Sequence, residues 1–438
     1  MGPLTAFVAL QTEKRKHGPF LSSLVCDSLN VKPNPESSVF DSMRKSPHRL
    51  WVLSIALLLG LGTSGRPPRL LAARPVFGQL ASDNPARTAL DKAVDTAVGE
   101  FFQQDQHVGL SVGISGHGEA VFYNYGTVNK SNVRLPDRKS AYEIASITKT
   151  FTGALASTAV LDKKMTLEED FRAYLTQRYP NLEKNGKFTT LRLLAAHRAG
   201  LPKNVPDTDT LFKNPNFDTL PFQRIELEKP YDDAAYLRAL HQVELRSEPG
   251  SDFLYSNFGI KLIGFGLQQV YHQSLEQLLQ TKILGPLGMK RTGLALSPQN
   301  ERLLVQGYSP GGKPRPYHLF NAGAAGGGYS DAEDMVRYID WQLDESDPTI
   351  RQSHSVIFGN GEKVQEGLIW YITREGGERE LWESGGAFGM ASQLVLYPES
   401  KIGIVLLAND GGFSTQDELR ELAKKIREAC GPQSVTGN

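Results

Sequence analysis

The apolar positions of this chain follow a helical pattern in some segments and a strand-like pattern in others. Helical spacing runs from residue 85 to 102, and two strand-like segments at 108–114 and 120–126 follow it, joined by a glycine-containing link. Helical spacing then dominates through the middle of the chain, and strand-like apolar runs return after residue 368. Strands near both ends with helices between them predict an α+β fold.

We expect the following elements. The helices are at 85–102, 150–161, 167–175, 191–197, 232–240, 257–271, 275–284, 332–343 and 418–429, and the strands are at 108–114, 120–126, 368–372, 380–383, 392–397 and 402–407. The two early strands form a hairpin, and together with the late strands they form one antiparallel sheet flanked by helices. A helical subdomain at about 146–345 is inserted into it, and its turn-rich segment 202–230 is expected to be a loop that contributes to a binding site.

The N-terminal region departs from this pattern. Four basic or histidine residues between 44 and 49 precede an apolar run at 51–62. A membrane-spanning helix needs about 20 apolar residues, whereas the core of an export signal needs roughly 7–15, so the run predicts a signal peptide. We expect translation to start at Met43, residues 1–82 to be a leader and linker, and residues 83–438 to be one domain. The protein would then be exported, periplasmic or secreted, with a membrane anchor only if the leader stays uncleaved.

Composition narrows the classes of function. The chain has 48 basic and 48 acidic residues and no sustained basic run outside the leader, so no nucleic acid partner is expected. Cys26 lies in the leader and Cys430 would be alone in the mature protein, so no disulfide framework is expected. The histidines show no metal-binding spacing and no phosphate-binding loop is present, so we expect neither a metal nor a cofactor.

The strongest chemical signal is Ser146 followed by Lys149. Residues three apart share a face of a helix, so the amine reaches the hydroxyl and, once desolvated, accepts its proton. A serine in the first helical turn also places an oxyanion near unpaired backbone N–H groups. The same spacing recurs at residues 42–45, but that segment has no helical period. On the motif alone, one alternative stays open: Ser146 is an ordinary helix cap.

Other motifs gain meaning only in combination. Tyr255 and Asn257 project from the start of a helix, where a phenol can shuttle a proton and an amide can bind a substrate amide. The segment 382–389 (WESGGAFG) leads out of a strand through glycines, which lets a ligand approach the backbone and offers a second oxyanion donor. The sequence 109–113 (GLSVG) matches a nucleophile elbow, but a strand rather than a helix follows it. His197 is expected to be structural, at a helix end.

Taken in order, these motifs resemble the serine β-lactamase and penicillin-binding protein superfamily, most closely its class C-like branch with D,D-peptidases and family VIII esterases. The resemblance spans about residues 85–430 and includes the segments 194–201 (LAAHRAGL) and 326–330 (GGGYS). It implies the β-lactamase/transpeptidase-like fold, Ser146 as the acylated nucleophile, Lys149 as its activating partner and Tyr255 as the proton shuttle. It further implies that Asn257 binds the substrate amide and that the N–H groups of Ser146 and Gly386 form the oxyanion hole.

One position departs from the branch. Where the branch has Lys-Thr-Gly or His-x-Gly beside the site, this chain has Glu383, Ser384 and Gly385. A carboxylate there would repel an anionic substrate end and raise the pKa of Tyr255, unless a cation neutralises it. Three functions therefore remain open: a hydrolase of β-lactams or D-Ala-D-Ala peptides, an esterase, and a catalytically poor penicillin- or peptidoglycan-binding protein. Each implies a small-molecule or peptidoglycan-type ligand.

Overall fold

The computed structural model describes residues 80–431, except for residues 105–106, 117, 318–322, 376 and 413. The chain divides into two compact units between Gly78 and Gln79, and the described residues belong to the second unit. The predicted leader, including the apolar run 51–62, Met43, Cys26 and the serine–lysine match at 42–45, lies outside the described residues. In the part of the chain that is described, no helix is long and apolar enough to cross a membrane.

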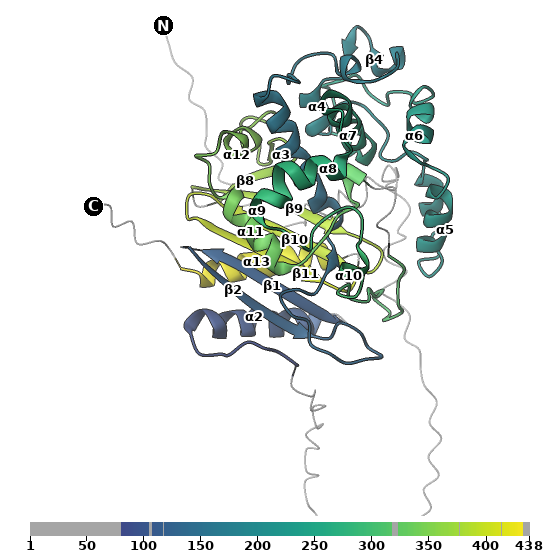
Figure 1. Ribbon diagram of the computed structural model, residues 1–438. Coiled ribbons are helices and arrows are strands. Elements are labelled where there is room, and N and C mark those ends of the chain that lie inside the picture. Colours follow the sequence, from purple (N-terminus) through teal and green to yellow (C-terminus); the bar gives the residue numbers. More distant parts are fainter. Residues whose placement is uncertain are drawn as a thin grey trace, which may run out of the picture. The chain divides into compact units, whose positions relative to one another are not determined.

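A seven-stranded sheet joins the two ends of the domain (Figure 1). Its strand order is β2-β1-β11-β10-β9-β8-β7, and every neighbouring pair is antiparallel. Val112 of β1 pairs with Leu406 of β11, so the early hairpin continues directly into the late strands. The strands are β1 (Gly109–Gly116), β2 (Glu119–Gly126), β7 (Gln365–Glu366), β8 (Tyr371–Glu375), β9 (Glu378–Gly386), β10 (Ala391–Tyr397) and β11 (Ile402–Ala408). The predicted α+β fold with one sheet from both chain ends is confirmed.

Alternation along the strands creates two apolar cores. In β11, Ile404 and Leu406 belong to the core under α2 (Ala89–Gln104) and α13 (Thr415–Ala429), whereas Val405 and Leu407 belong to the other core. Successive strand side chains point to opposite faces, which is why a fully buried strand supplies both cores. The second core includes α11 (Ala332–Gln342) and most of the helical region. Figure 1 shows α2 and α13 on one side of the sheet and α11 on the other.

The helical region lies between β2 and β7 in the sequence. Its remaining helices are α3 (Thr148–Leu161), α4 (Leu191–Ala195), α5 (Leu220–Glu228), α6 (Asp233–Leu240), α7 (Asn257–Tyr271), α8 (Leu275–Leu279), α9 (Gly285–Leu287), α10 (Pro298–Glu301) and α12 (Pro348–Ser353). Short turns are η2 (Ala145–Ile147), η3 (Phe171–Tyr174), η4 (Pro180–Leu182), η5 (Asp209–Phe212), the π-helical η6 (Gln280–Leu284) and η7 (Gly323–Ala325). Two small ladders pair β3 (Tyr142–Glu143) with β6 (Tyr329–Ser330) and β4 (Glu183–Lys184) with β5 (Lys187–Phe188).

Three expected elements were wrong. The segment 167–175 contains only η3, because the Asp170 side chain caps Arg172 N and Phe171 N donates to Thr189 O instead of continuing a helix. The segment 202–230 is not wholly a loop, since it holds η5 and the nine-residue helix α5.

The third difference concerns the apolar run 368–372, where the strand starts only at Tyr371. Leu368 N instead donates to Ser353 O, and Gly367 N donates to Trp370 O in a tight turn. Ile369 has φ of +67°, which is incompatible with a strand. The run is apolar because it is buried in the helical core, and burial alone does not distinguish a strand from a turn.

Candidate active site

Ser146 lies in η2, the 3-10 turn that leads directly into α3. The preceding Ala145 has φ of +44°, a left-handed conformation that costs a residue with a side chain about 1–3 kcal/mol. The turn is held from outside, because Ile144 N donates to Gly328 O and Gly328 N donates to Thr148 Oγ1. A Cβ on Gly328 would lie 2.6 Å from that oxygen, so the turn at 326–328 requires glycine there. The sharp turn fixes the position of the Ser146 hydroxyl.

Lys149 lies one turn further along, wholly buried, with Nζ 2.7 Å from Ser146 Oγ. The ammonium also donates to Ala325 O at the end of η7. Burial lowers the pKa of Lys149 to about 7, although the nearby Glu383 carboxyl opposes this shift. Lys203 and Arg224 lower the pKa further. A pKa near 7 lets the amine lose its proton near neutral pH.

Tyr255 approaches Ser146 from the other side. Its hydroxyl is 2.9 Å from Ser146 Oγ, and its ring centroid is 5.2 Å from Lys149 Nζ. Burial, followed by the Glu383 carboxyl, raises the pKa of Tyr255 far above its ordinary value. The side chain is therefore a neutral phenol at physiological pH, able to donate a hydrogen bond and to relay a proton.

His197 packs against this tyrosine. Its Nδ1 accepts a hydrogen bond from Ser256 N, its carbonyl accepts one from Leu254 N, and its ring packs 4.5 Å from that of Tyr255. Burial, together with the Lys149 charge, lowers the pKa of His197 to about 3, so the imidazole is neutral. It lies just after α4, in agreement with the structural role expected for it.

Asn257 begins α7 and lines the cleft above Ser146. Its Nδ2 donates to Asn204 Oδ1 at 2.9 Å, which orients the amide. The helix start itself is capped by Ser256, whose Oγ accepts from Gly259 N and donates to Pro202 O.

Strand β9 supplies the remaining predicted site residues, and they lie in different places. Gly386 lines the cleft, whereas Glu383 is buried, and its ionised form raises the pKa of both Lys149 and Tyr255. Ser384 donates to Gln393 Oε1 on β10. At Gly385 a Cβ would lie 2.2 Å from Ser392 Oγ and 2.3 Å from the Ile144 carbonyl oxygen. Gly385 therefore allows β9 to pack against the segment that carries the serine.

The Glu383 carboxyl is not a fixed anion. Burial raises its pKa to about 8, while Lys149 and the Ser384 backbone oppose the shift. It is consequently mostly protonated at neutral pH. The expected rise in the Tyr255 pKa is present, but the expected repulsion of an anionic substrate is much weaker than a permanent carboxylate would produce.

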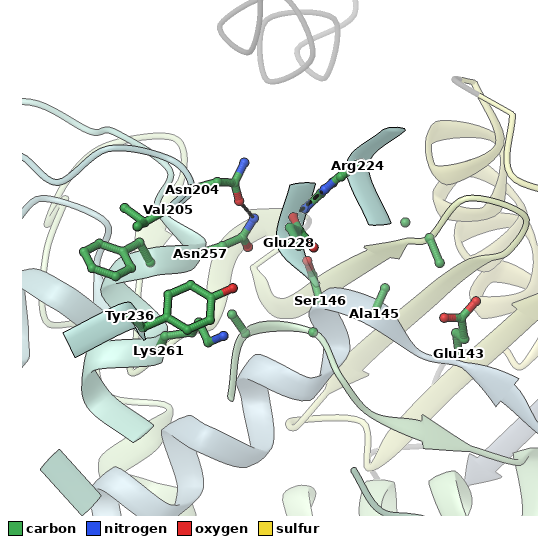
Figure 2. Close-up of a pocket in the computed structure, with 15 residues that line it drawn as sticks. Glu143, Ala145, Ser146, Asn204, Val205, Arg224, Glu228, Tyr236, Asn257 and Lys261 are labelled. Carbon is green, nitrogen blue, oxygen red and sulfur yellow. Dashed lines mark hydrogen bonds and ion pairs between the residues drawn. The ribbon is translucent and has the colours of Figure 1, made fainter. Parts of the chain in front are cut away.

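The cleft at Ser146 encloses about 670 Å³, including its open mouth. Figure 2 shows Ser146 at its centre, with Asn257 and Asn204 to one side and Arg224 and Glu228 above. Sequence reasoning missed several of its lining residues, which carry no motif and come from the 202–230 segment, α6 and α7: Asn204, Val205, Arg224, Glu228, Tyr236 and Lys261. Expecting the 202–230 segment to contribute to a site was the only signal that pointed toward them.

The competing match at residues 109–113 carries no site. Ser111 of the 109–113 sequence is buried within β1, where it donates to Asn124 Oδ1 and lies 3.0 Å from the Tyr142 hydroxyl. It therefore does not form a nucleophile elbow. Within the described ranges, no three His, Cys, Asp or Glu side chains are grouped to hold a metal ion.

Comparisons with known proteins agree with this geometry. The family model described as Beta-lactamase matches residues 93–428. A beta-lactamase of Lysobacter lactamgenus is 25% identical over 387 residues, covering 78% of this chain and 93% of that protein, and one of Pseudomonas fluorescens is 29% identical over 230 residues, covering 52% and 57%. The crystal structure of a beta-lactamase/D-alanine carboxypeptidase from Pseudomonas syringae superposes with a TM-score of 0.66 at 21% identity, covering 79% of this chain and all of that one.

Proposed function

The chain belongs to the beta-lactamase family, and from this premise and the geometry at Ser146 we propose that it hydrolyses amide or ester bonds through an acyl-enzyme on that serine. The observation that carries the proposal is the placement of Ser146 Oγ between Lys149 Nζ at 2.7 Å and the Tyr255 hydroxyl at 2.9 Å. A serine so placed has both a proton acceptor and a proton donor within reach.

The two neighbours have different roles. Lys149, whose pKa lies near 7, is the base that takes the Ser146 proton as the hydroxyl attacks the carbonyl carbon. Tyr255 stays a phenol because its pKa is far above neutral, so it relays a proton to the leaving group as the bond to that group breaks. A water molecule then attacks the acyl carbon and releases the product acid. Lys149 and Tyr255 accept the proton of this water and return it to Ser146 Oγ.

The cleft supports the rest of the assignment. Ser146 and Gly386 both line it, and their backbone N–H groups form the oxyanion hole in this proposal. Asn257, fixed by Asn204, binds the amide of the substrate. Glu383 modulates Lys149 and Tyr255, and Ser384 and Gly385 hold β9 in place beside the nucleophile.

The proposed substrate class rests on the named relatives and on the protonation state of Glu383. The relatives are a beta-lactamase and a beta-lactamase/D-alanine carboxypeptidase, so a β-lactam, a D-alanyl peptide or a related small amide or peptidoglycan-type substrate is the first choice. The neutral Glu383 permits such anionic substrates. An esterase is the second candidate, because β9 offers no cation where the resemblance leads one to expect it.

The leader completes the proposal. Residues 1–82 act as an export signal and linker, residues 83–438 form the hydrolase domain with its helical subdomain at about 146–345, and the protein works in the periplasm or outside the cell. The division of the chain between Gly78 and Gln79 supports a boundary close to residue 82.

The test is intact-protein mass spectrometry after incubation with a penicillin, on the full-length chain and on Ser146→Ala, with the remaining drug measured in parallel. We expect a covalent adduct or drug loss that Ser146→Ala abolishes. An equal effect with both proteins would refute Ser146 as the nucleophile. If the penicillin gives no signal, a Ser146-dependent release of p-nitrophenol from p-nitrophenyl butyrate would support the esterase alternative.

A further inference from the structure

The short segment Pro202–Asn204 is tied to the start of α7 at three consecutive residues. Ser256 Oγ donates to Pro202 O at 2.6 Å, Phe258 N donates to Lys203 O at 3.2 Å, and Asn257 Nδ2 donates to Asn204 Oδ1 at 2.9 Å. The backbone of Lys203 is therefore held in register with Tyr255 and Asn257.

The Lys203 side chain extends toward that centre. Its Nζ lies 6.0 Å from the centroid of the Tyr255 ring, whose hydroxyl contacts Ser146. Among the described residues, this ammonium has no hydrogen bond and no ion pair, although the side chain is only partly exposed. Asp209 acts on it from further away, and that carboxylate is paired with Arg246 at 3.2 Å.

A second cation, Arg224, acts on Lys203 through its charge. Arg224, on α5, lines the cleft and donates from Nε to Glu228 Oε1 at 2.8 Å (Figure 2). Burial, followed by the Arg224 charge, lowers the pKa of Lys203, so the positive charge is disfavoured where it lies. An anion placed between these two side chains would relieve both the desolvation and the mutual repulsion.

Neither Glu228 nor Glu383 already fills this role. Glu228 is held by Arg224, and Glu383 is mostly protonated at neutral pH. Lys261 lies deeper, with its Nζ 3.4 Å from the centroid of the Tyr236 ring, and adds to the positive character of the helical side. The cationic wall of the cleft is thus the helical one, while β9 presents no cation to the substrate.

We propose that Lys203, assisted by Arg224, forms a subsite for a carboxylate group of the substrate, on the helical side of the cleft rather than on β9. The subsite deepens and rests on the proposed hydrolase function, since it names anionic amides or esters as the preferred substrates. It makes Lys203 a specificity-determining residue that touches the substrate away from the bond that breaks.

The test compares two esters that differ only in charge, mono-p-nitrophenyl adipate and its methyl ester, on the full-length chain. The measured quantity is the ratio of kcat/KM for the anionic ester to that for the neutral ester, after subtraction of the Ser146→Ala background. We expect the ratio to fall at least tenfold in Lys203→Met, to recover largely in Lys203→Arg and to fall as NaCl is raised from 50 to 500 mM. Lys424→Met, which removes an exposed cation on α13, is the matched control and keeps the parent ratio. An unchanged ratio in Lys203→Met overturns the subsite.

A binding measurement separates this proposal from the proposed function. Calorimetric titration of Ser146→Ala with mono-p-nitrophenyl adipate measures binding without turnover. In the double variant Ser146→Ala/Lys203→Met, the dissociation constant should rise at least fivefold. If the parent protein hydrolyses neither ester but this loss of binding is seen, the hydrolase function is wrong and the anion subsite stands. If hydrolysis depends on Ser146 but Lys203→Met changes neither binding nor the ratio of the two kcat/KM values, the subsite is wrong and the hydrolase function stands.

Discussion

Lys149 Nζ lies 2.7 Å from Ser146 Oγ, with the lysine side chain wholly removed from solvent. The arrangement makes the serine reactive because burial disfavours the ammonium and so provides a neutral amine near pH 7. The same burial is unfavourable for folding, since the unfolded chain keeps this lysine charged and hydrated. Reactivity and stability are therefore opposed at this residue.

The first prediction concerns the pH dependence of acylation. The pKa of Lys149 is lowered to about 7, so the neutral amine decreases as pH falls through that value and kcat/KM should fall by about tenfold per unit below it. The ionised form of Glu383 raises the pKa of Lys149, so Glu383→Gln, which carries no charge, should move the midpoint of the profile slightly to lower pH. The measurement is kcat/KM for p-nitrophenyl butyrate from pH 5 to 9. A midpoint that moves upward in Glu383→Gln would contradict this effect of the carboxyl on the lysine.

The second prediction is that Lys149→Met inactivates the protein yet stabilises it. Methionine has nearly the same length, and it removes the desolvation of a group whose pKa is lowered from 10.5 to about 7 in the folded state. The unfolded chain binds this proton more tightly, so the parent protein carries the full penalty below about pH 7 and loses it as pH rises toward 10.5. We expect a gain of about 1 kcal/mol in the free energy of unfolding at pH 7, measured by urea denaturation. Lys424→Met is the control, and a loss of stability in Lys149→Met would mean that its hydrogen bonds to Ser146 and Ala325 outweigh the desolvation.

The third prediction separates the two proton-transfer roles. Tyr255→Phe removes the phenol that protonates the leaving group, so amide or β-lactam substrates should lose about 10²–10⁴-fold in kcat/KM. A p-nitrophenyl ester should lose much less, because p-nitrophenolate departs without a proton. The comparison is made by measuring kcat/KM on a penicillin and on p-nitrophenyl butyrate. Tyr179→Phe is the control, because the Tyr179 hydroxyl donates to Leu237 O. Equal losses on both substrates would assign Tyr255 to activation of the serine instead.

The sequence was sufficient for the parts of the site that are local. Ser146 and Lys149 meet because three residues of helix separate them, and Tyr255 and Asn257 stand at a helix start that Ser256 caps. The sheet was predictable for a related reason, since short apolar runs bounded by turn residues are a local signal.

What the sequence did not reveal depends on distant contacts. Helix α5 was missed because its nine residues show little apolar periodicity. Arg224 lines the cleft from this helix, and no sequence motif marked it as a site residue. Lys203 is placed by hydrogen bonds to residues more than 50 positions away, and the neutral state of Glu383 depends on burial in the assembled sheet. Charge alone suggested repulsion at Glu383, and only the three-dimensional environment changes that expectation.

The fourth prediction tests how β9 supports the nucleophile. Gly385→Ala would place a Cβ 2.2 Å from Ser392 Oγ and 2.3 Å from the Ile144 carbonyl oxygen, so either β9 or the segment before Ser146 must move. We expect this overpacking to lower the free energy of unfolding by about 1–3 kcal/mol. We also expect kcat to fall by more than the decrease in the fraction of folded protein explains. Gly99→Ala is the matched control, because nothing lies within 4 Å of its Cβ position in α2 and helix propensity should add up to about 1 kcal/mol.

Removing one of the two obstacles sharpens this prediction. Ser392 Oγ donates to the Ile144 carbonyl at 3.0 Å, so Ser392→Ala in the Gly385→Ala background eliminates the nearer clash but leaves the carbonyl in contact. Stability should recover in part, whereas activity should recover less, since the Ile144 carbonyl belongs to the backbone that fixes Ser146. Thermal denaturation and ester kinetics on the two single variants and the double variant give the comparison. Full activity in Gly385→Ala would show that the contact between β9 and Ile144 is not needed to hold the serine.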